Sequence, residues 1–200
     1  MQTGFWWILL SLIIYGVIHS LLAGLNTKKW VQDRLGLNLY RRYYRLFFSV
    51  QAALLFIPVL VLAAFLPDRV IYRVPSPWVW LTTIVQIGAV IILLQSVMMT
   101  GALRFVGLAQ AANPDQAEKP LPLVRRGLYR FVRHPIYTAT FLFIWLVPQM
   151  SWNMLALNIG VTVYTLIGAR FEERKLIKEF GEDYREYRKN TPFIIPFLKF

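Results

Sequence analysis

One dense group of residues that could do chemistry lies at 123–137, which reads LVRRGLYRFVRHPIY. Pro135 suits the first turn of a helix, because that position has no hydrogen-bond partner for the N–H that proline lacks. The start of a helix leaves other N–H groups free, and these groups, together with the guanidinium of Arg133, suit an anionic or carboxylate-bearing ligand. The stretch therefore indicates a site for a carboxylate.

A second group follows after the next apolar region, at 170–176, which reads RFEERKL. Its paired carboxylates, Glu172 and Glu173, could hold an amine or another cationic centre. A pocket with a carboxylate binder at one end and carboxylates at the other suits a small zwitterion. S-Adenosylmethionine is one such molecule, since it carries a carboxylate, an ammonium, a sulfonium and an adenine. The residues by themselves do not select it from other ligands.

Other kinds of site are excluded by what the chain lacks. It has no cysteine, which excludes disulfides, thiolate nucleophiles and cysteine-bound metals, and its two histidines are too few for an all-histidine metal site. We therefore predict no metal. His19 lies inside an apolar run, where an ionisable group is a functional candidate; the alternative is a neutral imidazole bonded to a neighbouring helix.

The elements that must position these groups are membrane helices. The composition is 57% hydrophobic and only 16% charged, which is typical of a membrane protein. The predicted fold class is all-α, an integral membrane bundle of five transmembrane helices in a single domain over residues 1–200. Apolar runs without Asp, Glu, Lys or Arg predict these helices at about 4–25, 46–66, 78–100, 135–147 and 153–169.

The last two predicted helices form a short hairpin joined by a polar turn at 148–153. The first of the two is shorter than the roughly 17 residues that usually span a bilayer. After the hairpin, we expect residues 170–200 to form a cytoplasmic segment that contains an amphipathic helix, with Gly181 weakening its middle and a tail from Thr191 folded back on the protein.

Basic residues predict the orientation. Alternating crossings put 20 of the 22 Lys and Arg residues on one face, which places the N-terminus outside and the C-terminus in the cytoplasm. This distribution explains the net charge of +12 without nucleic acid as a partner, and it makes anionic membrane lipids expected partners. Both chemistry-bearing stretches then lie where the hairpin meets the cytoplasm.

Several residues also have simpler interpretations. We read Arg125, Arg126 and Arg130 mainly as anchors on the positive face. Glu172 could pair with Lys175 on the same helix, an interaction of about 0.2–0.5 kcal/mol.

The order of motifs resembles a known superfamily. GLYRFVRHPIY, then a helical hairpin, then EERKL and FGEDYREY, resembles the membrane methyltransferases that include isoprenylcysteine carboxyl methyltransferase and phospholipid N-methyltransferases. HSLLA at 19–23 and YRRYYRL at 40–46 further resemble the bacterial branch with methanethiol S-methyltransferase and a denitrification-associated membrane family. The resemblance implies a bacterial inner-membrane enzyme that binds S-adenosylmethionine between the hairpin and the C-terminal segment.

The resemblance also implies particular residues. The implied cofactor-binding residues are Tyr129, Arg133, His134, Pro135, Tyr137, Glu172 and Glu173. The candidate catalytic residues are Arg133, His19 and Glu172. The expected acceptor is small or lipophilic and reached from the bilayer, with a thiol as the first choice and a phospholipid amine or a carboxylate as the second. The alternative is a non-catalytic member of the denitrification-associated family with an assembly or sensing role.

Overall fold

The computed structural model describes residues 3–117 and 122–198. The predicted domain also includes residues 1–2, 118–121 and 199–200, which lie outside the described residues. The chain divides into two compact units, and each unit is assembled from three separate segments of sequence. Because no single cut of the chain separates the units, they are not two successive domains, and the single domain stays a prediction.

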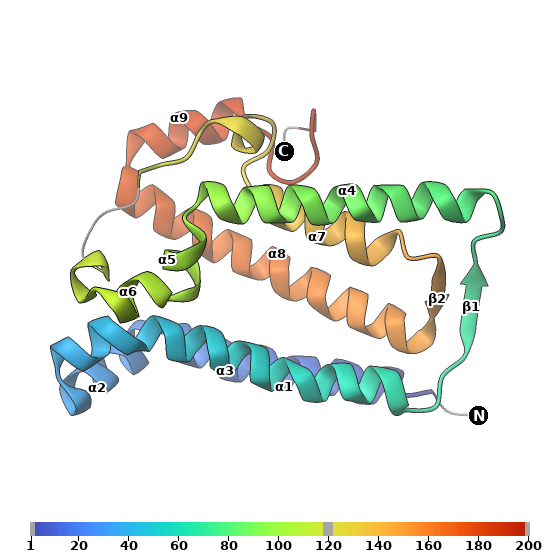
Figure 1. Cartoon of the computed structure of the whole chain (residues 1–200), viewed down its shortest axis with the longest axis horizontal. Helices are drawn as coiled ribbons and strands as arrows, with labels where there is room; N and C mark the ends of the chain where they lie inside the picture. Colours follow the sequence, from blue (N-terminus) through green and yellow to red (C-terminus); the bar gives the residue numbers. More distant parts are fainter. Residues whose placement is uncertain (1–2, 118–121, 199–200) are drawn as a thin grey trace. The chain divides into compact units, whose positions relative to one another are not determined.

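The first unit contains residues 1–69, 101–121 and 152–160. Its longest helix, α3, packs against α1, α2 and α6 (Figure 1). The first turns of α8 approach α1 closely, since a Cβ on Gly160 would lie 2.4 Å from Leu12 Cδ1. The elements are α1 Phe5–Ala23, α2 Leu25–Leu35, α3 Leu37–Phe65, α5 Ala102–Val106, α6 Leu108–Ala112, the 3-10 helix η1 Pro114–Ala117 and the beginning of α8.

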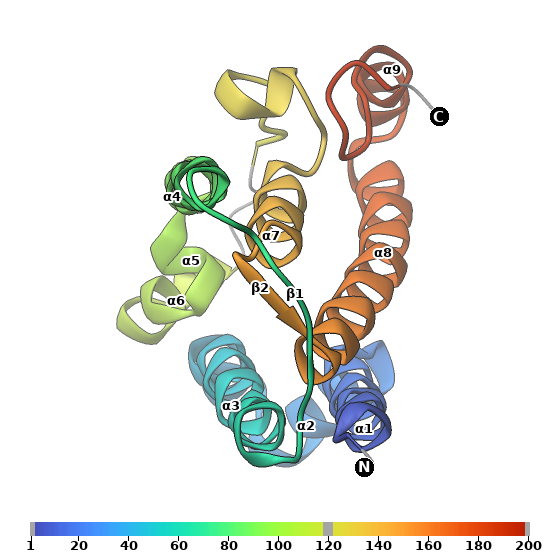
Figure 2. The ribbon, with the colours of Figure 1, turned by 90° about the vertical axis from the view of Figure 1, so that its right-hand side faces the viewer.

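The second unit contains residues 70–100, 122–151 and 161–200. Within it α4 and α7 pack side by side, as the end-on view in Figure 2 shows. Gln86 Nε2 donates a hydrogen bond to the Phe143 carbonyl at 2.8 Å, which joins the two helices by a polar contact. The elements are β1 Val70–Arg73, α4 Trp78–Met99, the 3-10 helix η2 Gly127–Arg130, α7 Pro135–Trp145, β2 Gln149–Ser151, the remainder of α8 Trp152–Phe180, and α9 Glu182–Asn190.

Four of the described helices are long and apolar enough to cross a membrane, namely α1, α3, α4 and α8. Their large apolar side chains are often exposed, with Trp6 at 76% and Phe65 at 84%, as expected where lipid covers them. The chain is therefore an integral membrane protein. The fifth predicted span corresponds to α7, whose 11 residues at about 1.5 Å each fall short of a layer of about 30 Å, so the count of five is not confirmed. The orientation of the termini stays a prediction.

The prediction of an all-helical fold missed a small sheet. The polar turn after α7 forms β2, which pairs antiparallel with β1, with Tyr72 opposite Met150. Val70, Ile71 and Tyr72 are residue types that favour strands, but a run of four residues carries too weak a pattern to predict one.

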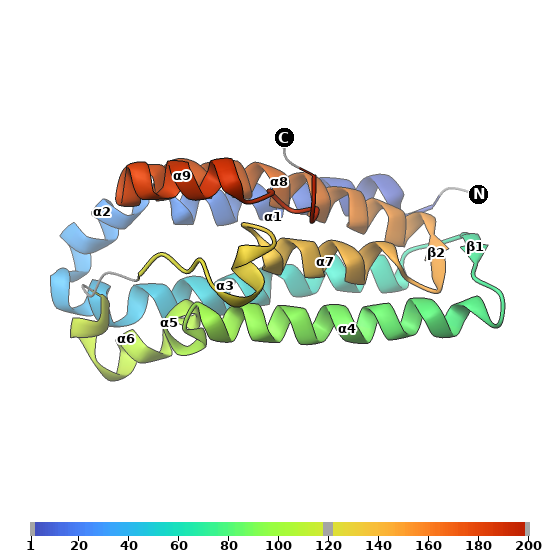
Figure 3. The same cartoon turned by 90° about the horizontal axis from the view of Figure 1, so that it is seen from above.

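The C-terminal helix also differs from its predicted form. The predicted helix at 153–169 does not end before the charged residues, and α8 continues unbroken to Phe180. Gly181, at φ +59°, then separates it from α9 (Figure 3). This backbone region is accessible to glycine at little cost, so Gly181 ends one helix and begins the next instead of weakening a single helix.

Replacing Gly107 with alanine is expected to lower the free energy of unfolding by about 2–4 kcal/mol. Gly107 has φ +102°, and a Cβ there would lie 2.4 Å from the backbone nitrogen of Leu46. Alanine therefore meets both backbone strain and a clash between the α5–α6 turn and α3. Denaturation by sodium dodecyl sulfate in mixed micelles measures the change.

Gly101 provides the matched control for this substitution. It also lies in the left-handed region, at φ +83°, but a Cβ there would meet only Arg104 Cβ, at 4.0 Å. Gly101→Ala should therefore cost about 1–2 kcal/mol, the backbone term alone. Equal losses in the two variants would contradict the close approach of Gly107 to α3.

Candidate functional site

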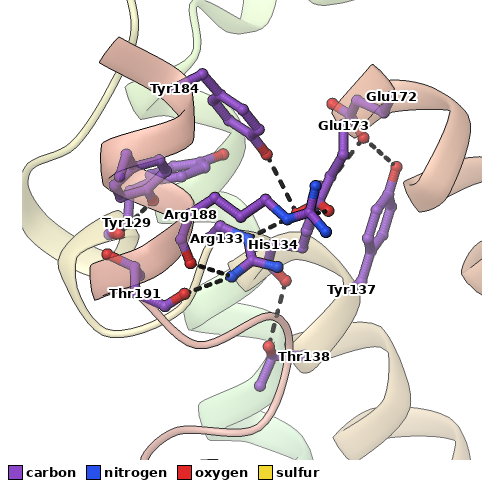
Figure 4. A network of polar contacts seen from close by, with 11 residues as sticks. Tyr129, Arg133, His134, Tyr137, Thr138, Glu172, Glu173, Tyr184, Arg188 and Thr191 are labelled. Atoms are coloured by element: carbon purple, nitrogen blue, oxygen red, sulfur yellow. Dashed lines mark hydrogen bonds and ion pairs between the residues drawn. The ribbon is translucent and has the colours of Figure 1, made fainter. Parts of the chain in front are cut away.

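A buried ion pair joins the two stretches that the sequence analysis singled out. Arg133 lies directly before α7, and Glu173 lies on the charged part of α8 beyond its apolar run. Arg133 Nε donates to Glu173 Oε1 at 2.6 Å, and the two side chains are only 5% and 10% exposed (Figure 4). Charged groups that leave water require such a partner, so this contact confirms that the two stretches meet.

The guanidinium of Arg133 is also tied to the C-terminal end of the chain. Its Nη1 donates to the Arg188 carbonyl at 3.0 Å and to the Thr191 carbonyl (Figure 4). The guanidinium also lies over the aromatic ring of Phe193, with its carbon 5.3 Å from the ring centroid. Arg133 thus links α8, α9 and the tail, and these internal bonds use donors that we had expected to meet a ligand carboxylate.

The tail folds back onto the beginning of α7, as predicted for its described residues. The backbone N–H of Arg133 donates to the Pro192 carbonyl at 2.8 Å, and that of His134 donates to the Phe193 carbonyl at 3.2 Å. Thr138 Oγ1 donates to the Ile194 carbonyl at 2.6 Å. Pro135 occupies the first turn of α7 as predicted. The N–H groups of residues 133 and 134 are therefore occupied by the protein itself and are not available to an anion.

Arg133, His134, Tyr137, Glu172 and Glu173 form one polar cluster. Within this cluster, His134, Tyr137 and Glu172 have polar atoms that can still bind a ligand. The ring of His134 stacks on that of Tyr137, with centroids 5.1 Å apart, and Tyr137 Oη donates to Glu172 Oε2 at 2.7 Å (Figure 4). The Glu172 side chain is 48% exposed and lies 3.7 Å from His134 Nδ1. An exposed carboxylate held in place from one side can still accept from an amine or a hydroxyl.

His134 Nε2 is buried and makes no hydrogen bond with a described residue. Its nearest carboxylate oxygen is Glu173 Oε1 at 3.4 Å, a contact that lacks hydrogen-bond geometry. The side chain of His134 is 5% exposed, so water does not satisfy this nitrogen from an open surface. Buried polar atoms without partners are uncommon, and at this place the atom indicates a position for a ligand group.

Two tyrosines complete the cluster from outside the membrane helices. Tyr184 is 1% exposed, and burial, together with the charge of Glu173, raises the pKa of its hydroxyl, which therefore stays protonated and donates to Glu173 Oε1 at 3.2 Å. Burial, with the charge of Glu172, raises the pKa of Tyr129 to about 12. Tyr129 Oη contacts the Ser96 carbonyl at 3.4 Å, which ties η2 to α4.

Removing the hydroxyl of Tyr184 should destabilise the second unit. Tyr184→Phe takes one donor from the buried carboxylate of Glu173, and a hydrogen bond to a charged group contributes about 1.5–3 kcal/mol. The midpoint of thermal unfolding in detergent should therefore fall. Tyr43→Phe, at a tyrosine that is 46% exposed, is the control and should leave the midpoint unchanged. An unchanged midpoint for both variants would refute the role of this bond.

His19 belongs to the first unit and not to the segments that build this cluster. It lies on α1, where its ring stacks on Tyr15 at 5.6 Å and contacts Phe48 at 4.5 Å between centroids. The predicted catalytic role of His19 is not tested by these contacts and stays a prediction. Of the arginines read as anchors, Arg125 pairs with Asp183 at 3.2 Å and Arg130 covers the ring of Phe131.

Sequence reasoning missed the residues that close the cluster from α9 and the tail. Arg188 lies 3.8 Å from Glu173 Oε2 through its Nε, and Thr191 accepts from Arg133 through its carbonyl. The amphipathic helix predicted within 170–200 includes Tyr184 and Tyr187, and an apolar face of such a helix is expected to pack. This prediction did not indicate which carboxylate or carbonyl those hydroxyls bond.

Comparison with known proteins matches the sequence of this chain to methyltransferases. The family model described as phospholipid methyltransferase matches residues 83–183, which include the whole of the Arg133 and Glu173 pair. No solved structure gives a significant match.

Two bacterial relatives match over nearly the whole chain. Methanethiol S-methyltransferase 1 of Bradyrhizobium diazoefficiens is 30% identical over 96% of this chain and 66% of its own length. Methanethiol S-methyltransferase of Pseudomonas deceptionensis is 30% identical over 95% of this chain and 72% of its own length. A human relative, protein-S-isoprenylcysteine O-methyltransferase, is 30% identical over 61% of this chain and 43% of its own length.

Proposed function

Because the chain belongs to the phospholipid methyltransferase family and is a methyltransferase, we propose that it transfers a methyl group from S-adenosylmethionine to a small thiol resembling methanethiol. Two relatives that carry the name methanethiol S-methyltransferase match over 96% and 95% of this chain, and this extent is the observation that carries the choice of a thiol. The isoprenylcysteine relative covers only about three fifths of the chain.

The residues of the cluster fit a zwitterionic nucleoside donor. The exposed carboxylate of Glu172 would hold its ammonium group, and the unpartnered Nε2 of the buried His134 would meet a polar group of the same ligand. When bound, S-adenosylmethionine supplies a methyl group activated by a sulfonium. Tyr137 fixes Glu172 through its hydroxyl and fixes the ring of His134 by stacking, so both groups are oriented before the ligand binds.

Arg133 has a positioning role in this proposal. Its bonds to Glu173 and to the carbonyls of Arg188 and Thr191 hold α8, α9 and the tail around the ligand-binding residues. The same bonds exclude water from the base of the cluster. A water-excluding site favours the attack of a thiolate on a sulfonium, because the opposite charges cancel as the transition state is reached.

The thiol must lose its proton for this reaction. The new bond joins the acceptor sulfur to the methyl carbon, the old carbon–sulfur bond of the sulfonium breaks, and the thiol proton passes to a base. Because Glu172 holds the ammonium of the donor in this proposal, the proton passes finally to solvent, and the exposed carboxylate of Glu172 is the candidate relay within the cluster. His19, which is among the candidate catalytic residues that the resemblance implies, is the second candidate base.

The test uses purified protein, methyl-labelled S-adenosylmethionine and one acceptor at a time. Methanethiol should yield labelled dimethyl sulfide in the headspace, whereas phosphatidylethanolamine should leave the lipid fraction unlabelled. Label in the lipid fraction without volatile product would replace the thiol by a phospholipid amine. Tight cofactor binding without transfer to a thiol, an amine or a carboxylate would refute the proposed reaction.

A further inference from the structure

The first unit contains a cavity of about 380 Å³ that the methyl-transfer proposal does not use. The cavity lies where the C-terminal end of α1, the helix α2, the beginning of α3 and the helix α6 meet. Its lining residues are Ala23, Lys28, Leu37, Tyr40, Arg41, Tyr44, Arg45, Phe48 and Gln110.

The lining of this cavity is strongly cationic. Lys28, Arg41 and Arg45 contribute three positive charges, and none of the lining residues is acidic. The guanidinium of Arg45 is held in place, since its Nε donates to the Phe105 carbonyl at 2.8 Å and its carbon lies 5.3 Å from the centroid of the Phe105 ring. A fixed guanidinium beside two further cations suits a phosphate, which accepts several charge-assisted hydrogen bonds at once.

Gln110 adds an acceptor to this cationic cavity. Its side chain is oriented by Nε2, which donates to the Arg104 carbonyl at 3.1 Å. The residue is 9% exposed, and its Oε1 is buried without a hydrogen bond from any described residue. A buried acceptor left without a donor destabilises the protein, so a ligand hydroxyl at this position would be favoured. The phosphodiester of a lipid has no hydroxyl on its phosphorus, so the donor to this acceptor would come from the rest of the headgroup.

The position of the cavity along the helices indicates a lipid. It lies at the end of the charge-free run of α1 and directly before that of α3, which is the level at which headgroups meet a spanning helix. On α3 the following side chains Phe47 and Val50 are 53% and 49% exposed, so they offer an apolar surface to acyl chains. A headgroup in the cavity and its chains along α3 would then be bound by adjacent parts of one unit.

We propose that this cavity binds the headgroup of an anionic glycerophospholipid that carries hydroxyl groups, such as phosphatidylglycerol. Lys28, Arg41 and Arg45 bind the phosphate, and Gln110 Oε1 accepts from a headgroup hydroxyl. Phe48 of the lining contacts His19, the second candidate base, so the test measures lipid retention and not methyl transfer, and its variants leave both of these residues unchanged.

Native mass spectrometry of the purified full chain tests the site. The protein is released from a neutral detergent in the presence of phosphatidylglycerol or phosphatidylcholine at equal concentrations. Wild-type protein should retain one phosphatidylglycerol at least ten times more tightly than phosphatidylcholine. The double variant Arg41→Gln/Arg45→Gln should lose this preference by at least tenfold. Equal retention of phosphatidylglycerol by wild type and double variant would overturn the proposal.

Matched controls distinguish a loss of lipid binding at this site from an effect of net charge and from unfolding of the variant. Lys29→Gln/Arg34→Gln removes two charges from α2 at residues outside the lining, and it should retain the preference. Arg41→Lys/Arg45→Lys preserves the charge, and it should recover at least part of the binding if the double glutamine variant has failed to fold. Loss of binding in the α2 control would show a general effect of charge and would overturn the assignment.

Two further probes identify the ligand chemistry. Gln110→Met should reduce the preference for phosphatidylglycerol over phosphatidic acid about threefold or more, because it removes the acceptor for a headgroup hydroxyl. Inorganic phosphate at millimolar concentration should not displace the retained lipid. Displacement at that concentration would show a site for the free anion and would overturn the choice of a lipid, and an unchanged preference in Gln110→Met would overturn the role of the hydroxyl.

Discussion

Replacing Arg133 with methionine is expected to lower the free energy of unfolding by about 3–5 kcal/mol. The substitution leaves the buried carboxylate of Glu173 without its cation, and it also leaves the carbonyls of Arg188 and Thr191 without their donor. The apolar stem of methionine fills much of the same space, so the loss reports on charge and hydrogen bonding more than on packing. Denaturation by sodium dodecyl sulfate in mixed micelles measures it.

Two comparisons distinguish this effect from a general loss of charge. Arg130→Met removes a guanidinium from the same stretch, but Arg130 only covers the ring of Phe131, so this variant should stay within about 1 kcal/mol of wild type. In Arg133→Met/Glu173→Met both partners are apolar, and part of the stability should return because no buried charge remains unpaired. If Arg130→Met and Arg133→Met lost equal stability, the central place of the Arg133 and Glu173 pair would be refuted.

Replacing Glu172 with glutamine is expected to weaken the binding of S-adenosylmethionine about 10- to 100-fold with little change in stability. A charge-assisted hydrogen bond to a ligand ammonium contributes about 1.5–3 kcal/mol, and glutamine retains the shape without the charge. Stability should change little because the Glu172 side chain is 48% exposed. Isothermal titration calorimetry gives the dissociation constant, and the thermal midpoint gives the stability.

Two further variants test whether the loss of cofactor affinity is specific to the residues of the cluster. His134→Ala should also weaken cofactor binding while leaving the helical content intact, because it removes the unpartnered Nε2. Glu182→Gln is the matched control, since Glu182 is an exposed carboxylate that pairs with Arg185 at 3.0 Å and lies outside the cluster. Unchanged affinity in both Glu172→Gln and His134→Ala would remove the site assignment, and weakened affinity in Glu182→Gln would attribute the effect to overall charge.

Much of the helical framework could be predicted from composition and hydrophobic runs. The run at 78–100 corresponds to α4 at Trp78–Met99, because long charge-free stretches have one stable form in a bilayer, the helix. The helix α3 begins at Leu37, earlier than the predicted 46, since its first nine residues include three arginines and therefore lie outside any charge-free apolar run. The strands were missed because three or four residues form a pattern only with a partner, and that partner is distant in the sequence.

The sequence indicated which residues lie near one another in the cluster, but it did not indicate which of them bond to each other. Arg133 and Glu173 were predicted at opposite ends of one ligand pocket, and the structure brings them together as a direct ion pair. The predicted role of Arg133 as a binder of a ligand carboxylate is replaced by a structural role, because its guanidinium bonds to the protein itself. Glu172, and not Glu173, is the exposed carboxylate. Which of two adjacent glutamates faces inward depends on the rotation of α8, and no periodicity in a charged segment sets that rotation.

The amino-acid sequence alone determined the membrane class and the two charged stretches of the cluster, because hydrophobicity and charge are properties that each residue carries with it. It predicted five spanning helices, and four of the described helices are long and apolar enough to cross a membrane. Only the tertiary structure decided that the tail caps α7, that Tyr184 donates to Glu173 and that Gln110 closes a cationic cavity. Those outcomes depend on the distance and direction between groups far apart in the chain, which packing sets and composition does not.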